Sequence, residues 1–153
     1  MEKLALGSSL PDFSGSDQNA QLISSSDYKG QRLVIYFYPK DDTPGCTAQA
    51  CSIRDGQEAL VAAAVKVIGI SADSVAAHAK FSAKYQLNFP LIADTNKEIL
   101  AQFGVWGPKK FMGRIYDGIH RTTFVFNEKS ELIKVIDKPN TKDHANEVLA
   151  CFS

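Results

Sequence analysis

The amino-acid sequence predicts an α/β protein whose mixed central sheet is flanked by helices. Apolar, β-branched and aromatic runs alternate with helix-like stretches along the chain, which is the element order of an α/β sheet. The strand-like runs are apolar nearly throughout, as expected for strands covered on both faces. Near the C-terminus two such runs are joined by residues 127–130 alone, which implies an antiparallel pair. The sheet is therefore expected to be mixed.

The first half of the chain predicts two strands around one long helix. Residues 7–30 are rich in Ser, Gly, Asp and Asn, which favours loops and a small hairpin. The run 33–38 predicts a buried strand, and 65–71 predicts a second. Between them residues 44–64 are expected to form a helix, because Pro44 suits the first helical position and alanine is frequent throughout.

The second half predicts the remaining helices and strands, with a loop between residues 104 and 121. In chain order these are a helix from a Ser74 cap to about residue 86, a strand at 89–93, a helix at 95–103 stopped near Gly104, strands at 121–127 and 131–137, and a helix at 141–152. Without an internal repeat or a linker, residues 1–153 are expected to form a single domain.

Composition narrows the function classes. Seventeen basic residues balance seventeen acidic ones, so no net field favours nucleic acid or an anionic membrane. No apolar run approaches 18 residues, and the N-terminal segment lacks the apolar stretch of a secretory signal, so a cytoplasmic location is expected. Three cysteines fit a secreted disulfide framework poorly. In a reducing compartment, closely spaced cysteines are catalytic, redox-active or metal-binding more often than structural.

Residues 39–51, PKDDTPGCTAQAC, form the most informative segment. The loop after the predicted strand places Cys46 in the first turn of the expected helix. Unpaired backbone N–H groups and the helix dipole favour negative charge there. Such a setting lowers the pKa of a cysteine into the range of about 3.5–7.5, and the thiolate is the nucleophilic form. A thiolate that attacks a peroxide O–O bond becomes a sulfenic acid.

Three further residues are candidates for a peroxide pocket. The hydroxyl of Thr43 could donate to a peroxide and accept from elsewhere. Pro39 could shape the pocket and exclude water from its side. A cation is also needed, and Arg121, at the start of a predicted strand, is best placed by topology.

Cys51 offers a way to recycle a sulfenic acid, because a second thiol condenses with it to form a disulfide. In a helix, Cα atoms five positions apart are separated by about 8.7 Å. A disulfide normally needs Cα atoms within about 6.8 Å. If both cysteines are helical when reduced, the first turns must unwind, and we expect residues 44–53 to open during turnover.

Other interpretations of the cysteines remain open from the residues alone. They could be small buried hydrophobes on an Ala-rich helix. A zinc site would need four ligands, and the chain has neither a second cysteine pair nor a spaced histidine pair. A disulfide reductase would normally carry Cys-x-x-Cys. A redox sensor is a further alternative, in which oxidation of Cys46 signals by unwinding the helix.

The remaining cysteine and the histidines are expected to have minor roles. Cys151, near the C-terminus, is predicted to be a bystander. His78 and His144 are expected at the surface or half-buried with satisfied hydrogen bonds. His120 could orient the neighbouring Arg121.

Several segments of the chain resemble one protein family. They are YFYPK at 36–40, TPGCT at 43–47, QAC at 49–51, RD at 54–55, QFGVWG at 102–107, FMG at 111–113 and YDGIHR at 116–121. In these motifs the chain resembles the peroxiredoxins, specifically the bacterioferritin comigratory protein or peroxiredoxin Q group, over nearly its whole length.

The resemblance implies a thioredoxin-like fold of the peroxiredoxin type and a thiol peroxidase acting on hydrogen peroxide and organic hydroperoxides. It implies thioredoxin as reductant, no metal or organic cofactor, and a monomer with an intramolecular disulfide. Carried over by position, Cys46 is the peroxidatic cysteine and Cys51 the resolving one. Pro39, Thr43 and Arg121 complete the pocket with the backbone N–H groups of Gly45 and Cys46.

Overall fold

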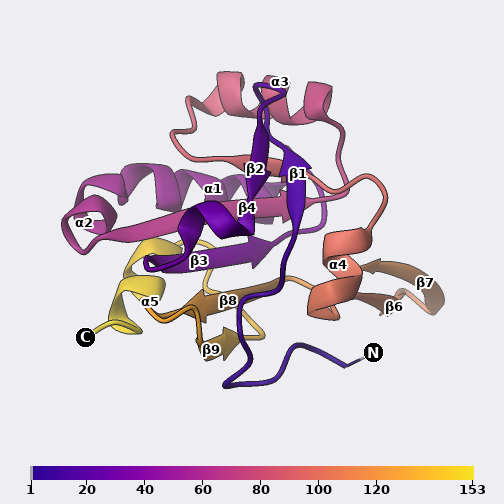
Figure 1. The fold of residues 1–153 in the computed structure, drawn as a ribbon. Coiled ribbons are helices and arrows are strands. Elements are labelled where there is room, and N and C mark those ends of the chain that lie inside the picture. The colour runs from indigo at the N-terminus through magenta and orange to yellow at the C-terminus, as the bar shows by residue number, and fades with distance from the viewer. Residues whose placement is uncertain (1) are drawn as a thin grey trace.

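The computed structural model describes residues 2–153, and a seven-stranded mixed sheet runs through its centre (Figure 1). The strand order is β2-β1-β5-β4-β3-β8-β9. The three central strands β3, β4 and β5 are parallel, and β8, β9, β1 and β2 pair antiparallel. The strands are β1 (Ser14–Ser16), β2 (Leu22–Ser24), β3 (Arg32–Phe37), β4 (Val65–Ser71), β5 (Leu91–Ala93), β8 (Thr122–Phe126) and β9 (Leu132–Ile136). The predicted mixed sheet and the small N-terminal hairpin are confirmed.

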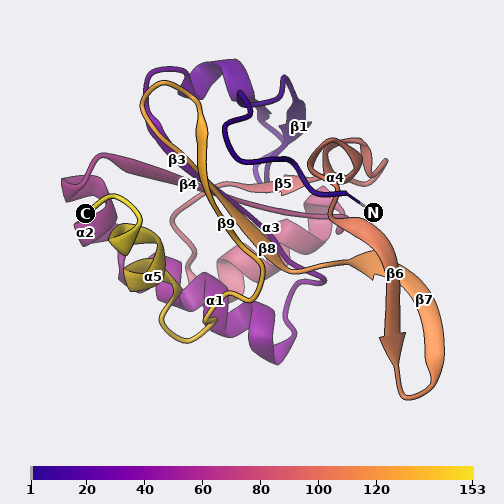
Figure 2. The ribbon, with the colours of Figure 1, turned by 90° about the horizontal axis from the view of Figure 1, so that it is seen from below.

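Helices cover both faces of this sheet (Figure 2). They are the 3-10 helix η1 (Ser25–Tyr28) and the α-helices α1 (Pro44–Asp55), α2 (Gln57–Ala62), α3 (Val75–Tyr85), α4 (Glu98–Phe103) and α5 (His144–Ala150). No helix within residues 2–153 is long and apolar enough to cross a membrane.

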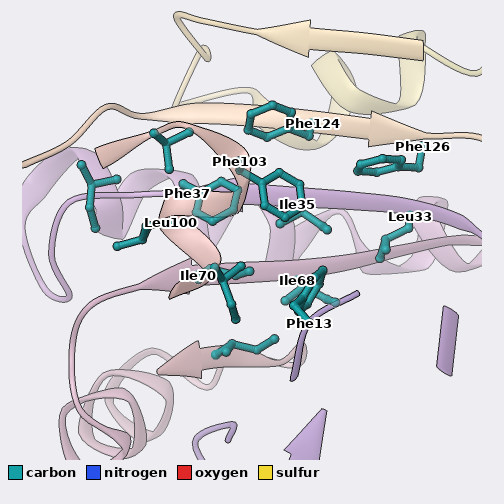
Figure 3. Packing of buried hydrophobic residues seen from close by; sticks show 14 of the residues in the cluster. Phe13, Leu33, Ile35, Phe37, Ile68, Ile70, Leu100, Phe103, Phe124 and Phe126 are labelled. Atoms are coloured by element: carbon teal, nitrogen blue, oxygen red, sulfur yellow. The ribbon is translucent and has the colours of Figure 1, made fainter. Parts of the chain in front are cut away.

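Alternation along β3 divides the core into two clusters, because successive side chains of a strand point to opposite faces. Leu33, Ile35 and Phe37 pack with α4 on one face, where Phe103 meets Phe37 and Phe124 (Figure 3). Val34, Tyr36 and Tyr38 pack on the other face beneath α1, α3 and α5. Cys46 belongs to this second cluster.

The prediction of one helix over 44–64 is wrong, because the helix is interrupted at Gly56. α1 ends at Asp55 and α2 begins at Gln57. A Cβ atom on Gly56 would lie 2.4 Å from the Cβ of Ala145, so α5 packs directly against the glycine. The interruption therefore reflects a tertiary contact as well as the low helix propensity of glycine.

The expected loop between residues 104 and 121 is also wrong, because it contains a second, two-stranded sheet. β6 (Trp106–Phe111) and β7 (Arg114–Ile119) form a hairpin that projects from the body of the molecule (Figure 2). Met112 and Gly113 form its turn with φ values of 51° and 78°. Positive φ at both positions is the geometry of a type I′ turn, which matches the twist of the flanking strands.

The remaining predicted elements are present with shifted ends. The side chain of Ser74 caps α3 by accepting from Ala77 N at 3.1 Å, and Gly104 ends α4 in the left-handed conformation. β5 and α4 begin two or three residues later than expected, and α5 is confined to His144–Ala150. Most errors are therefore at helix and strand ends.

The expectation for two of the histidines is corrected, because His78 and His144 are fully buried. His144 Nδ1 donates to Glu147 Oε1 at 2.8 Å, and its Nε2 lies 3.0 Å from Thr123 Oγ1. Burial lowers the pKa of His144, which favours the neutral ring. Specific partners make the burial of these polar rings tolerable.

We predict that Gly56→Ala destabilises the protein by about 1–3 kcal/mol, because the added methyl group overpacks the contact between α1 and α5. Urea unfolding monitored by circular dichroism measures the loss. Ala145→Gly is the matched partner: combined with Gly56→Ala it removes the clash, so the double variant should lose less stability than the sum of the two single variants. Additive losses would contradict direct packing at this site.

Candidate active site

Cys46 lies in the first turn of α1, the helix that follows the central strand β3. β3 ends at Phe37, the loop 38–43 follows, and Cys46 is the third residue of the helix. Its side chain is only 1% exposed and packs in the cluster that contains Tyr36. The first-turn position expected from the sequence is thus present, with the backbone N–H groups of the first turn lacking intrahelical partners.

Arg121 reaches Cys46 from a distant part of the sequence. Its Nη2 group donates to Cys46 Sγ at 3.2 Å, and its Nη1 group donates to Gln49 Oε1 at 2.6 Å. Sheet register brings these residues together: Phe37 at the end of β3 pairs with Thr122 at the start of β8. The residues that follow Phe37 and the residue before Thr122 therefore lie at the same edge of the sheet.

Gly45 gives the guanidinium room. A Cβ atom at this position would lie 3.1 Å from Arg121 Nη2, which is closer than most real Cβ contacts. A larger side chain here would crowd the cation. The glycine thus eases the close approach of Arg121, and its backbone φ is not positive.

Gln49 is a site residue that the sequence analysis did not identify. Its side chain is completely buried, and its Oε1 is the acceptor that holds Arg121. Its Nε2 has no hydrogen-bond partner among residues 2–153. Residues three apart share a helix face, so the position of Gln49 three residues after Cys46 was the available signal.

His120 does not orient Arg121 by a hydrogen bond in the part of the chain that the structure describes. Its Nε2 instead lies 3.0 Å from the Pro108 carbonyl oxygen, which ties it to the β6–β7 hairpin. Gln49 occupies the orienting role that the sequence analysis suggested for His120.

Tyr36 lies beneath α1 with a buried hydroxyl group that has no hydrogen-bond partner among the described residues. Burial, and secondly negative charge on Cys46, raise the pKa of Tyr36 well above its usual value. Tyr36 therefore keeps its proton and remains an unused donor in the cluster that contains Cys46.

Thr43 and Pro39 belong to the loop before Cys46. The hydroxyl of Thr43 donates to the Lys40 carbonyl oxygen at 2.9 Å, so its oxygen can still accept a hydrogen bond. Pro39 is half-buried at the beginning of this loop. In this state the Thr43 hydroxyl proton stabilises the turn and is not directed to a ligand.

Cys51 lies in the same helix as Cys46, and both thiols are free. Five helical positions separate their Cα atoms by about 8.7 Å, beyond the usual disulfide limit of about 6.8 Å. The third thiol, Cys151, follows α5, and burial raises its pKa. Within residues 2–153 the one close group of three possible metal ligands is Asp41, Asp73 and His78, which includes no cysteine.

Comparison with known proteins decides the family. The AhpC/TSA family model matches residues 6–135. The chain is 44% identical to peroxiredoxin Bcp of Escherichia coli over 149 residues, covering 97% of this chain and 96% of that protein. It is 40% identical to peroxiredoxin Bcp of Bacillus subtilis over 146 residues, covering 95% and 93%. The chain is a peroxiredoxin of the AhpC/TSA family.

Solved structures confirm the fold of this peroxiredoxin as thioredoxin-like. A cysteine-to-serine variant of PrxQ from Xylella fastidiosa superposes with a TM-score of 0.91 at 29% identity, covering 99% of this chain and 97% of that one. Bacterioferritin comigratory protein from Xanthomonas campestris superposes with a TM-score of 0.84 at 33% identity, covering 90% and 88%. The peroxiredoxin is therefore an oxidoreductase, a thiol-dependent peroxidase.

We predict that Gln49→Leu slows the reaction of the peroxiredoxin with hydrogen peroxide by about tenfold, equivalent to about 1.4 kcal/mol. Leucine fills a similar volume but removes the acceptor that holds Arg121. Stopped-flow measurement of the oxidation rate checks this. Gln57→Leu, in α2, is the matched control and should leave the rate unchanged. Equal rates for Gln49→Leu and the wild type would show that Arg121 does not depend on Gln49.

Proposed function

We propose that this peroxiredoxin reduces hydroperoxides at Cys46 and recycles the oxidised cysteine through Cys51. The observation that supports the first assignment is the 3.2 Å contact between Arg121 Nη2 and Cys46 Sγ, which puts a permanent cation beside a buried sulfur. A cation there can donate to the negative charge that develops on the peroxide oxygens.

In the first step the Cys46 thiolate attacks the terminal peroxide oxygen. The S–O bond forms as the O–O bond breaks, and the leaving oxygen takes a proton and departs as water or an alcohol. Cys46 becomes a sulfenic acid, oxidised by two electrons. Arg121 and the backbone N–H groups of Gly45 and Cys46 would stabilise the oxygens, and Thr43 Oγ1 would accept from the peroxide O–H. Pro39 would keep water from this side.

In the second step the Cys51 thiol attacks the Cys46 sulfur. The S–S bond forms, the S–O bond breaks, and water leaves with the thiol proton. A dithiol protein, which we propose to be thioredoxin, then reduces the disulfide by exchange and is itself oxidised. Because the two cysteines are too far apart in α1, the helix must open before this step.

The wider setting of the proposal follows the family. The Xanthomonas campestris protein is described for alkyl peroxide reduction, which supports organic hydroperoxides as substrates here alongside hydrogen peroxide. We further propose a cytoplasmic, single-domain monomer with an intramolecular disulfide, acting without a metal or organic cofactor and without nucleic acid or membrane as a partner.

We predict that Cys46→Ser abolishes peroxide consumption, whereas Cys51→Ser keeps the first turnover and loses recycling by thioredoxin. The serine hydroxyl is not ionised at neutral pH, and without Cys51 the sulfenic acid has no neighbouring thiol. A coupled thioredoxin assay and mass spectrometry of the reacted proteins measure the two steps. Cys151→Ser is the matched control and should behave like the wild type. Turnover by Cys46→Ser, or normal recycling by Cys51→Ser, would contradict the respective assignment.

We also predict that the disulfide form exchanges backbone amide hydrogens faster than the reduced form over residues 44–53. The disulfide cannot close across an intact helix, so the first turns of α1 should stay open in the oxidised state. Hydrogen exchange with mass spectrometry measures this, and α3 serves as an internal reference. Equal protection of residues 44–53 in both forms would rule out the opening.

A further inference from the structure

A buried polar cluster holds the loop before Cys46. Asp41 Oδ2 lies 2.6 Å from His78 Nδ1, and Asp41 Oδ1 accepts from the Tyr38 hydroxyl at 2.6 Å. His78 comes from α3 and is completely buried. Its Nε2 lies 3.0 Å from the Ile92 carbonyl oxygen in β5. Asp41 is therefore connected directly to α3 and, through His78, to β5, and neither element is part of α1.

Donor and acceptor counting fixes the protons in this cluster. A carbonyl oxygen can only accept, so His78 Nε2 carries a proton and donates to Ile92. The contact between His78 Nδ1 and Asp41 Oδ2 then needs a second proton, which either of these two atoms can carry. The pair holds two protons and is neutral overall, whichever partner carries the bridging proton. Removing His78 would leave a buried carboxyl group without its partner, which is costly in a low-dielectric interior.

The backbone of the same loop is held as well. Asp41 N donates to Asp73 Oδ2 at 2.9 Å, and Ser71 Oγ donates to the same oxygen at 2.6 Å. Asp41, Asp73 and His78 form a close group of possible metal ligands, but these hydrogen bonds already engage their facing atoms. The cluster is complete without an ion, and its physical effect is to fix the loop.

Ties at both ends leave the catalytic segment between two fixed points. Upstream, Asp42 accepts from Tyr85 Oη at 2.7 Å, next to the buried Asp41 anchor. Downstream, Arg54 Nη1 donates to the Tyr85 carbonyl oxygen at 2.7 Å. Both anchors use α3, so α3 holds the flanks of α1 while neither anchor involves residues 43–51.

We propose that His78 is a positioning residue, which acts through Asp41 to hold the loop 39–43 in place around Cys46. This inference rests on the proposed function of Cys46. The loop carries Pro39 and Thr43, the side chains proposed to line the peroxide pocket. The peroxide step needs this loop fixed, whereas disulfide formation needs α1 to open. An anchor on α3 meets both requirements because it does not depend on α1 being folded.

Two substitutions of His78 separate positioning from plain stability. The amide nitrogen of asparagine reaches the place of Nδ1, so His78→Asn keeps a donor to Asp41 and loses the Ile92 contact. The amide nitrogen of glutamine reaches the place of Nε2, so His78→Gln keeps the Ile92 contact and loses Asp41. We expect His78→Gln to react with hydrogen peroxide about tenfold more slowly and His78→Asn within about twofold of the wild type. Disulfide formation after the first step should stay within twofold in both.

The measurements are stopped-flow oxidation by hydrogen peroxide, quenched mass spectrometry of the Cys46–Cys51 disulfide, and thermal unfolding of each variant. Ser74→Ala is the control, because it removes the cap of the same helix without touching the loop, and its oxidation rate should match the wild type. Tyr38→Phe is a second test, because it preserves the packing of the ring but removes the hydrogen bond to Asp41. We expect this variant to be oxidised about threefold more slowly.

Equal oxidation rates for His78→Gln and His78→Asn, or a wild-type rate in Tyr38→Phe, would overturn the positioning role while leaving the function of Cys46 intact. A slow His78→Gln matched by an equally slow Ser74→Ala would also overturn it, since lower helix stability would then explain both. If wild-type Cys46 fails to react with hydrogen peroxide, the proposed function and this inference fall together.

Discussion

Two cysteines five residues apart on one helix cannot form a disulfide while that helix is intact, and the structure is organised around this constraint. The cluster beneath α1 and the contact from Arg121 require a folded first turn, since both depend on where that turn places Cys46. A disulfide with Cys51 requires the same turn to open. If Cys51 resolves Cys46 as we propose, one short segment must therefore be stable enough to form the site and must also open in each catalytic cycle.

The composition of the segment makes such a balance possible. Residues 44–53, the segment expected to open, read PGCTAQACSI, so they contain one large apolar side chain, that of Ile53 at the C-terminal end. Ile53 is completely buried and supplies most of the apolar cost of opening. Apart from Ile53, opening the segment thus exposes little apolar surface. The free-energy cost of exposing such surface is about 25 cal/mol per Å², so this remaining cost is small. Gln49 Nε2, buried without a partner among the described residues, costs about 1–3 kcal/mol in the closed helix and would be hydrated in the open one.

The sequence could predict those structural features whose cause lies in neighbouring residues, and it missed most of those that depend on contacts between distant residues. The apolar runs of β3 and β4 predict buried strands on their own, and the loop before Cys46 predicts that this cysteine lies in the first turn of a helix. The β6–β7 hairpin was missed because Gly107, Pro108 and Gly118 are poor strand residues and its tip is solvent-exposed. The break at Gly56 depends on Ala145, and the burial of His78 depends on a partner 37 positions away. Arg121 was predicted as a site residue because the strand order limits the possible topologies. Gln49 was missed, and its only signal was that it shares a helix face with Cys46.

Arg121 is held by the fixed sheet, whereas Cys46 belongs to the helix that is expected to open. This difference bears on which reaction the oxidised cysteine undergoes next. Arg121 precedes β8 and is placed by the pairing of Thr122 with Phe37, so its backbone belongs to the sheet and not to α1. If the first turns open as we propose, Cys46 moves away from Arg121, whose backbone the sheet holds in place while its guanidinium also loses Gln49. In the proposed cycle a sulfenic acid at Cys46 would then lose the cation that favours its reaction with a second peroxide, and would approach Cys51 instead. On the proposed mechanism, the fixed sheet would thereby favour disulfide formation over further oxidation, because the backbone that carries Arg121 remains behind when the helix opens.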